Sequence, residues 1–310
     1  MTRISCVSKL KSIAILSTIL LLIPAGLFGQ GPSKTSFEFS YDYFPYQKLS
    51  EAEQGTFYED LEIRVQKFNF EISHPLVFSR GRTILINNFG YQRLEIDYMN
   101  WDEVEGRDEP RVDDLHALSY TLFVRRVIDN TWSMAFLFNP GIASDFKGAL
   151  MLEDFSLQFG AIFSKQFSSK FALGFGAIYS TQFGHPIPLP ALSFQWNNGS
   201  NLRANVIIPV NMEFWYDASE RIDLGVLMKI DGNEFHADPE IYGYDNPNFR
   251  FADAMIGPAA EMRMLPWMKV NLYGGYTYLR YFEFYNNYYE IAGYDPNNSL
   301  FFRAGLTFER

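Results

Sequence analysis

The chain has 310 residues and a formal net charge of −10, and aromatic residues make up 17% of it. Its Lys and Arg residues form no basic cluster of the kind that neutralises phosphates, so the composition argues against a nucleic-acid-binding protein. The length fits one large all-β domain or two ordinary domains, and because no Gly/Ser-rich or Pro-rich linker divides the chain we expect one.

The N-terminal segment predicts export. Three basic residues precede the uncharged run SIAILSTILLLIPAGLFG, which ends in small residues before Gln30. This order is typical of a secretory signal peptide, so we expect cleavage after Gly29, with 1–29 removed and 30–310 forming the mature domain. The alternative is an N-terminal membrane anchor, but the apolar run is a little shorter than the roughly 20 residues that a spanning helix needs. The only cysteine, Cys6, precedes the run, so the mature chain relies on no disulfide.

Apolar and polar residues alternate with a period of two along most of the remaining chain, which predicts β-strands. In 61–72 the apolar set changes parity, which we interpret as a one-residue slip near Gln66. The segment 202–216 alternates without interruption and predicts one long strand that suits a tilted membrane crossing. The predicted strands are 37–45, 61–78, 83–98, 115–128, 131–139, 151–167, 170–183, 188–196, 202–216, 221–230, 249–264, 268–284 and 299–309.

This count is odd, whereas single-chain barrels of the bacterial outer membrane have an even number of strands. Short turns alternate with long polar connections whether the strands are counted from the N-terminus or from the C-terminus. The two counts disagree by one strand in the middle of the chain. The doubtful element is 188–196, because Pro186, Pro188 and Pro190 each remove a ladder donor. We therefore interpret Pro186 to Pro190 as a kinked or inward-folded segment and predict about twelve strands.

Alternation alone does not separate a membrane barrel from a secreted soluble β protein, which remains an alternative. In 171–179, however, Ala172, Gly174 and Gly176 oppose large apolar residues. Such small residues suit the inner wall of a barrel better than a water-facing surface. Aromatic residues also gather towards strand ends, as in interfacial girdles. We predict an all-β fold, a transmembrane antiparallel up-and-down β-barrel in contact with the lipid of a Gram-negative outer membrane.

The last strand, SLFFRAGLTFER, resembles the C-terminal signal that the barrel-assembly machinery recognises. Phe302, Gly305, Leu306 and Phe308 carry this resemblance, while Arg310 stands where an aromatic residue is usual. We therefore expect that machinery to be a partner of the precursor.

The region from Pro186 to His236 resembles a poorly characterised family of outer-membrane β-barrel proteins that is classed as a domain of unknown function. The shared order is a proline-rich entry, a strand that ends in an aromatic residue, a strand that contains Ile-Pro, and a Tyr-led turn. The resemblance extends at lower resolution over 35–310. It implies the barrel fold and brings no activity or cofactor with it.

Few residues offer chemistry. His116 and Ser119 lie three apart on a predicted strand and so face opposite sides, which excludes a nucleophile and base pair there. In DGNEFHAD, Glu234, His236 and Asp238 would share a face, but the spacing does not match a calcium loop, and we interpret the segment as a solvated acidic loop. We expect neither an enzyme nor a cofactor or metal site.

Charges of both signs fall on the predicted inner face, so no single-sign selectivity ring is expected. We predict a narrow passive channel or small-solute transporter with a mixed-charge lumen. The alternative is a non-conducting structural or interaction barrel whose acidic, Tyr-rich loops at 242–248 and 292–298 bind a surface partner. The predicted lumen-lining residues are Glu62, Arg64, Glu71, Arg93, Glu95, Arg125, Arg203, Glu213 and Arg303.

Overall fold

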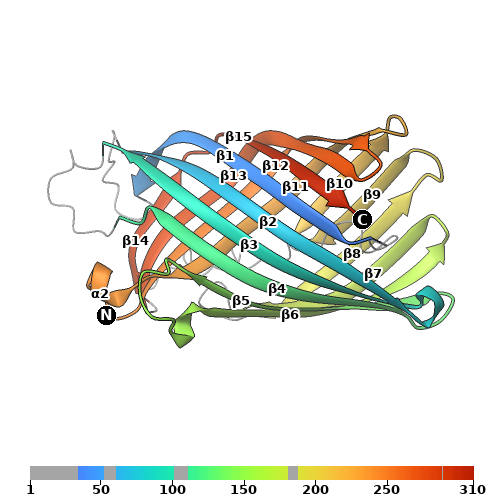
Figure 1. Ribbon diagram of the computed structural model, residues 1–310, viewed down its shortest axis with the longest axis horizontal. Coiled ribbons are helices and arrows are strands. Elements are labelled where there is room, and N and C mark those ends of the chain that lie inside the picture. The colour runs from blue at the N-terminus through green and yellow to red at the C-terminus, as the bar shows by residue number, and fades with distance from the viewer. Residues whose placement is uncertain (1–33, 52–60, 101–110, 181–187, 288) are drawn as a thin grey trace.

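The computed structural model describes residues 34–51, 61–100, 111–180, 188–287 and 289–310. The predicted signal peptide, 1–29, and Pro186 lie outside these residues. Within the described ranges the strands form one antiparallel sheet that closes on itself (Figure 1). Closure is complete because β15 pairs with both β1 and β13, which leaves no long unpaired edge. No helix in these ranges is both long and apolar enough to cross a membrane.

Short helical turns accompany the strands: η3 (Ser79–Gly81), η5 (Leu152–Asp154) and α2 (Pro239–Tyr242). The strands are β1 (Ser36–Glu51), β2 (Glu62–Phe78), β3 (Thr83–Met99), β4 (Asp114–Val127), β5 (Trp132–Ser144), β6 (Phe155–Ser168), β7 (Phe171–Ser180), β8 (Leu189–Asn197), β9 (Leu202–Ile208), β10 (Asn211–Asp217), β11 (Ile222–His236), β12 (Pro247–Leu265), β13 (Met268–Asn286), β14 (Tyr289–Pro296) and β15 (Leu300–Glu309). The short connections at 79–82, 129–131 and 168–170 define one end of the barrel, called the turn end here. The connections at 145–154 and 237–246 lie at the opposite loop end.

The barrel has 14 strand positions, because β14 and β15 share one of them. Both lie between β13 and β1. β14 pairs with Phe282–Asn286 of β13, near the loop end, while β15 pairs with Met268–Tyr276, near the turn end. The predicted fold class is confirmed, with 14 strands in place of about twelve.

The difference in strand number arises at two segments. The run 202–216 is not one strand but the hairpin of β9 and β10, which reverses at Pro209 and Val210. Ile207 pairs with Asn211, so odd-numbered residues face the same side before and after the turn, and the alternation continues unbroken through it. The other segment, 189–197, is an ordinary strand, β8, in which Pro190 pairs with Ala177 of β7.

The outer surface carries a belt of exposed, large apolar side chains. Phe136, Phe159 and Phe175 of three neighbouring strands are 37%, 40% and 59% exposed, and the residues next to them in sequence face inward. Comparable residues occur on the strands all around the barrel, including Phe39 of β1 and Phe302 of β15. A soluble barrel would place such side chains inside, so this surface requires an apolar medium such as lipid.

Towards the loop end the polarity of the two faces inverts. At the start of β2, Ile63 and Val65, with Leu61 just before the strand, are buried inside the barrel, while the residues between them are polar and face outward. The register of β2 against β3 is continuous from Glu62 to Phe78, so the slip predicted near Gln66 does not exist. The parity of the apolar residues changes where the strand leaves the apolar belt. Between the belt and the loop end, the outer face meets a polar medium and the inner face packs into a protein core.

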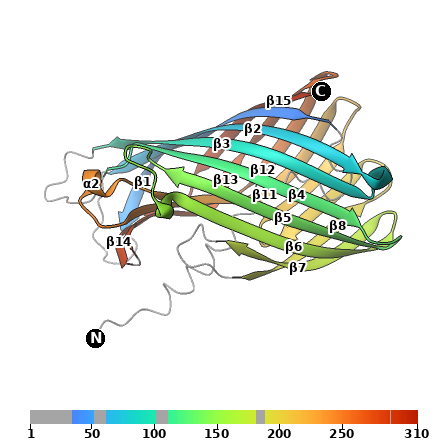
Figure 2. The same ribbon diagram turned by 60° about the horizontal axis from the view of Figure 1, so that its bottom comes forward.

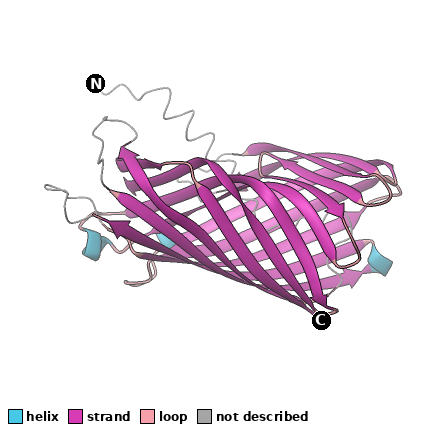
Figure 3. Ribbon diagram, turned by 90° about the horizontal axis from the view of Figure 1, so that it is seen from above, coloured by secondary structure: helices cyan, strands magenta, loops and turns pink. Residues whose placement is uncertain are grey.

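The loop end is also narrower than the turn end. β10 pairs with β11 only as far as Lys229, and β11 then continues to His236, which pairs in parallel with Ser144 of β5. The strands β6 to β10 are therefore absent from the ring of strands where β5 meets β11. Figure 2 shows β7 ending well before β2 and β3 do on the loop-end side, and Figure 3 shows shorter and longer strands in the same sheet. The space between the remaining strands is filled by an apolar cluster that includes Phe44, Phe249 and Phe282, called the loop-end core here.

Candidate functional site

A cavity of about 950 Å³ occupies the turn-end half of the barrel interior and is called the chamber here. Its wall includes residues from the turn at 168–170, so the chamber reaches the turn end. Five of the nine predicted lumen-lining residues line it: Glu71, Arg125, Arg203, Glu213 and Arg303.

The structure does not place the other four, Glu62, Arg64, Arg93 and Glu95, in the lumen. They alternate with residues of the loop-end core and so lie on the outer face of β2 and β3. Arg64 Nη2 lies 2.6 Å from Asp97 Oδ2, and Arg93 Nη2 lies 2.6 Å from Glu95 Oε1 and 2.9 Å from Asp114 Oδ2. The prediction assumed that polar residues face inward along the whole strand. Between the apolar belt and the loop end the polar residues face outward instead.

Charged residues are distributed unequally around the chamber. The strands β5 to β8 contribute no charged side chain to its wall among the described residues. The other side, called the charged wall here, carries Glu38, Glu71, Arg125, Arg203, Glu213, Lys229, Glu261, Lys269, Arg303 and Glu309. One further charged residue of the chamber wall, Lys170, lies in the turn between β6 and β7.

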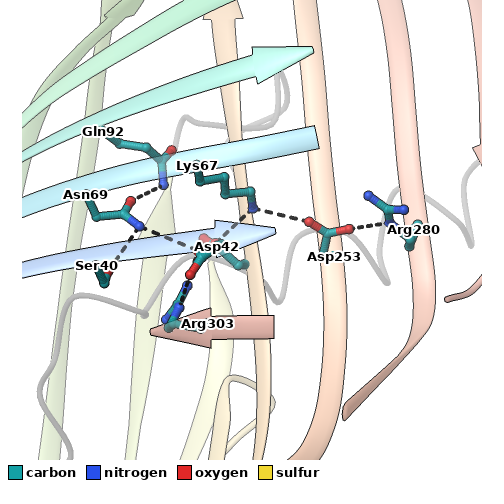
Figure 4. A network of polar contacts seen from close by, with 9 residues as sticks. Ser40, Asp42, Lys67, Asn69, Gln92, Asp253, Arg280 and Arg303 are labelled. Carbon is teal, nitrogen blue, oxygen red and sulfur yellow. Dashed lines mark hydrogen bonds and ion pairs between the residues drawn. The ribbon is translucent and has the colours of Figure 1, made fainter. Parts of the chain in front are cut away.

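Between the chamber and the loop-end core lies a cluster of ion pairs that joins strands that are not neighbours in the sheet (Figure 4). Lys67 Nζ of β2 donates to Asp231 Oδ2 of β11 at 3.0 Å and to Asp253 Oδ2 of β12 at 3.2 Å. Arg280 Nε donates to Asp253 Oδ1 at 2.6 Å. Lys67, Asp231, Asp253 and Arg280 are called the cross-lumen cluster here. It contains two cations and two carboxylates, so its charges balance.

The cross-lumen cluster borders aromatic rings of the loop-end core. Lys67 Nζ lies 4.7 Å from the centroid of the Phe251 ring and 5.3 Å from that of Phe44, and the Arg280 guanidinium lies 4.9 Å from Phe44. Cations at such distances from ring faces are stabilised by the aromatic quadrupole. The cluster therefore links β2, β11, β12 and β13 at the boundary of the chamber that faces the loop end. Together with the loop-end core, its side chains fill the barrel axis there.

Arg303 forms a second strong pair beside this cluster. Its guanidinium donates through Nη2 to Asp42 Oδ2 at 2.6 Å and also through Nε to Asp42 Oδ1. Two donors on one carboxylate make the bidentate geometry in which arginine pairs are strongest. The pair joins β15 to β1 at the strand junction that closes the barrel (Figure 4).

A second cavity of about 140 Å³ adjoins the chamber, and its wall includes Ala143 and Met255 of the loop-end core. Four residues line both cavities: Glu38, Glu71, Lys229 and Arg303. The second cavity is lined further along by polar residues and by the end of β5, and it reaches Gly232 of β11 near the contact between β5 and β11. The second cavity therefore continues from the chamber towards the loop end, between polar residues and residues of the loop-end core.

The acidic loop of the sequence is divided among different partners. Arg250 Nε donates to Glu234 Oε2 at 2.9 Å, His236 Nδ1 lies 2.8 Å from Asp154 Oδ1, and Asp238 caps α2. In the part of the chain that the structure describes, no three His, Cys, Asp or Glu residues are grouped to hold a metal ion.

His116 and Ser119 lie on opposite faces of β4. The His116 ring faces outward, with Nδ1 2.9 Å from the hydroxyl of Tyr91, while Ser119 lines the second cavity. The two side chains therefore do not form a nucleophile and base pair.

Comparison with models of protein families identifies the family of this chain. Residues 25–309 match the model described as "Domain of unknown function (DUF6268)". The chain belongs to this family. This confirms the resemblance seen in the sequence, and no match was found among curated proteins.

Several solved structures are similar at low identity. An outer membrane channel from Pseudomonas putida F1 is 11% identical with a TM-score of 0.41, covering 89% of this chain and 95% of that one. The P. putida toluene transporter TodX is 8% identical with a TM-score of 0.44, covering 96% and 94%. A Pseudomonas aeruginosa FadL homologue is 9% identical with a TM-score of 0.44, covering 90% and 91%. At these values none of them indicates a substrate or mechanism for this chain.

Proposed function

We propose that this chain is an outer-membrane β-barrel of a Gram-negative bacterium that acts as a narrow passive channel for small polar solutes. The observation that carries the proposal is the chamber of about 950 Å³, lined by charges of both signs, inside a closed barrel. The apolar belt on the outer surface supports a membrane location. The mixed signs of the charged wall favour a channel that admits solutes by size and polarity, not by the sign of their charge.

The path that we propose runs from the chamber into the second cavity. The cross-lumen cluster and the loop-end core occupy the barrel axis, so a straight axial route is filled with side chains. Glu38, Glu71, Lys229 and Arg303 line both cavities and therefore surround the passage between them. We propose that Glu71 and Arg303, with the chamber residues Arg125, Arg203 and Glu213, influence which solutes enter.

Uptake of arabinose and of larger neutral sugars by liposomes that contain the folded mature chain tests this function. The blocking variant is Ser119→Phe, which places a ring in the second cavity. Its matched control is Leu192→Phe on β8, which lines neither cavity and is 57% exposed on the outer surface. We expect a size cutoff and at least a halving of arabinose uptake in Ser119→Phe, with no change in Leu192→Phe. Folding of each variant is verified by heat-modifiable migration on a gel.

The second candidate function is a non-conducting structural or interaction barrel. The filled loop end favours it specifically, because apolar side chains close the axis there. An impermeable vesicle that contains verified folded barrel would establish this alternative, and the segments 242–248 and 292–298, the latter beginning in β14, would then be tested for a surface partner.

A further inference from the structure

The cations of the chamber wall differ in whether a carboxylate of the barrel neutralises them. We infer that the chamber holds a binding site for a small oxoanion of the phosphate class, with the Arg125 guanidinium as its cationic group. The inference goes beyond the proposed channel function, because binding in the chamber does not require passage through the barrel. The described cations that line the chamber are Arg125, Lys170, Arg203, Lys229, Lys269 and Arg303.

Four of these cations already lie beside carboxylates of the barrel. An anionic solute at any of the four would have to displace or approach a negative charge, so they are poor sites for an anion. The ion pairs are Arg203 with Asp217, Lys269 with Glu309 and Arg303 with Asp42, and Lys229 shares the wall of the second cavity with Glu38, Glu71 and Asp231.

Arg125 of β4 differs from these four. It forms no ion pair and no side-chain hydrogen bond with any residue that the structure describes. Its register partners are Ile84 of β3 and Ala135 of β5, and Ala135 lies opposite Ile162 of β6, so the neighbouring positions on both sides are uncharged. Arg125 therefore presents its positive charge and its N–H donors to the chamber.

Polar side chains line the chamber beside Arg125. Ser133 of β5 lies diagonal to Arg125, because Arg125 pairs with Ala135, and Ser133 itself pairs with Ser164 of β6. Gln166 is the next residue of β6 on the same face. The side chains of Ser133, Ser164 and Gln166 form no hydrogen bond with any described residue. Diagonal neighbours on adjacent strands are about 7–8 Å apart, so one small ligand can contact both Arg125 and Ser133.

This set of groups matches the chemistry of a phosphate. A guanidinium presents two parallel N–H donors to two oxygens of one phosphate, and hydroxyl and amide groups donate to the remaining oxygens. A cationic solute would find no carboxylate on β4, β5 or β6 in the described wall of the chamber. The groups around Arg125 therefore favour an oxoanion over a cation.

Lys170 adds positive charge at the turn end. It lies in the turn between β6 and β7, and its Nζ donates to the backbone oxygen of Asn198 at 2.9 Å. It forms no ion pair with a carboxylate of the described chain. A cation at this rim raises the local concentration of anions at the chamber.

The site lies in the chamber and not in the passage between the cavities. Glu38, Glu71, Lys229 and Arg303 surround that passage and carry both signs, whereas Arg125 lines the chamber alone. We therefore expect the site to retain oxoanions in the chamber, while the charges at the passage favour neither sign.

The test is calorimetric titration of the folded mature chain in detergent. The probes are inorganic phosphate and ribose 5-phosphate, with ribose as the uncharged reference. We expect saturable binding of both phosphates and none of ribose. Tighter binding of inorganic phosphate would identify the free anion as the better ligand, and tighter binding of ribose 5-phosphate would identify a phosphorylated solute.

Two pairs of variants locate the site. Arg125→Gln should weaken phosphate binding about tenfold or more, because a charge-assisted contact is lost. Its matched control is Arg126→Gln, the next residue, which is exposed and lines neither cavity, and binding should be unchanged. Ala135→Glu keeps Arg125 but places a carboxylate directly opposite it and should abolish binding, whereas the uncharged Ala135→Gln should retain it. Heat-modifiable migration verifies that each variant has folded.

The outcomes separate this inference from the channel function. If the folded parent binds neither phosphate, or if Arg125→Gln and Arg126→Gln weaken binding equally, the inference is overturned, and arabinose uptake by liposomes still decides the channel. Equal binding by Ala135→Glu and Ala135→Gln would also overturn it. Saturable binding that depends on Arg125 in a barrel that admits no arabinose would support the site and remove the channel function.

Discussion

Replacing Lys67 by Met should destabilise the barrel strongly, because this lysine is the only cation that contacts both carboxylates of the cross-lumen cluster among the described residues. The side chains of Lys67 and Asp253 are 2% and 0% exposed. Met has nearly the length of the lysine stem, so the packing against Phe44 and Phe251 is largely kept and the loss is electrostatic. Removal of one partner from a buried ion pair costs about 3–5 kcal/mol. Asp253 keeps its bond to Arg280, whereas Asp231 loses its ion-pair partner, which places the expected loss near the lower end of that range.

The charge balance of the cluster provides a second, sharper expectation. Lys67→Met leaves one excess negative charge, and Asp231→Asn in the same chain removes it. We therefore expect the double variant to recover about 1–3 kcal/mol of the free energy of unfolding, the coupling usual for residues in contact. The control is Lys165→Met on the outer surface, where the amine lies 5.6 Å from the centre of the Trp132 ring and the loss should stay below about 1 kcal/mol.

The assay is urea unfolding of the folded barrel in phospholipid vesicles, followed by tryptophan fluorescence. Heat-modifiable migration confirms that each variant has folded before the titration. The reasoning is refuted if Lys67→Met costs no more than the Lys165→Met control, or if Asp231→Asn makes the loss in the Lys67→Met background larger.

Three further predictions test other parts of the molecule. At the turn end, backbone N–H groups of Thr131 and Trp132 donate to Asp129 and lower the pKa of its carboxyl below its ordinary value of 3.8. A lowered pKa means that the carboxylate stabilises the folded state above the unfolded pKa and loses this effect as pH falls through the folded pKa. Asp129→Asn should therefore be less stable than the parent near neutral pH and equal to it at the acid end of a pH series of unfolding curves; a difference independent of pH would contradict this. Arg303→Gln leaves the buried Asp42 without its ion-pair partner and should cost about 3 kcal/mol, while Arg64→Gln on the outer face should cost less than about 1 kcal/mol; equal losses in urea unfolding would argue against the placement of the two residues. Finally, Phe302→Ser with Phe308→Ser should lower the heat-modifiable fraction in outer membranes several-fold if the outward face of β15 is the assembly signal, and Ala304→Ser on the same face should not; unchanged yield would remove that role.

Within the apolar belt, local sequence was sufficient to identify the inner and outer faces of a strand. Phe171, Leu173 and Phe175 alternate with Ala172 and Gly174, and the structure places the first set outward and the second inward. The last strand follows the same rule. Its one apparent exception, Phe301, faces inward and packs against Phe44 and Tyr273 in the loop-end core. These features depend on residues adjacent in sequence, whose directions follow from the period of the strand.

The tertiary structure decided the number of strands, the part of each strand that crosses the apolar belt, and the pairing of the lumen charges. Alternation continues unchanged through the hairpin at Pro209 and Val210, so the sequence alone could not separate β9 from β10. Arg64 and Glu71 are both charged residues of β2, and both were predicted to line the lumen, yet only Glu71 faces the chamber. Within the apolar belt the polar side of a strand faces the lumen, whereas nearer the loop end it faces outward. Lys67 meets Asp231 and Asp253 across 164 and 186 residues of chain. A period of two shows that the two faces of a strand meet different media, but which medium lies on which side depends on where closure of the barrel places that strand.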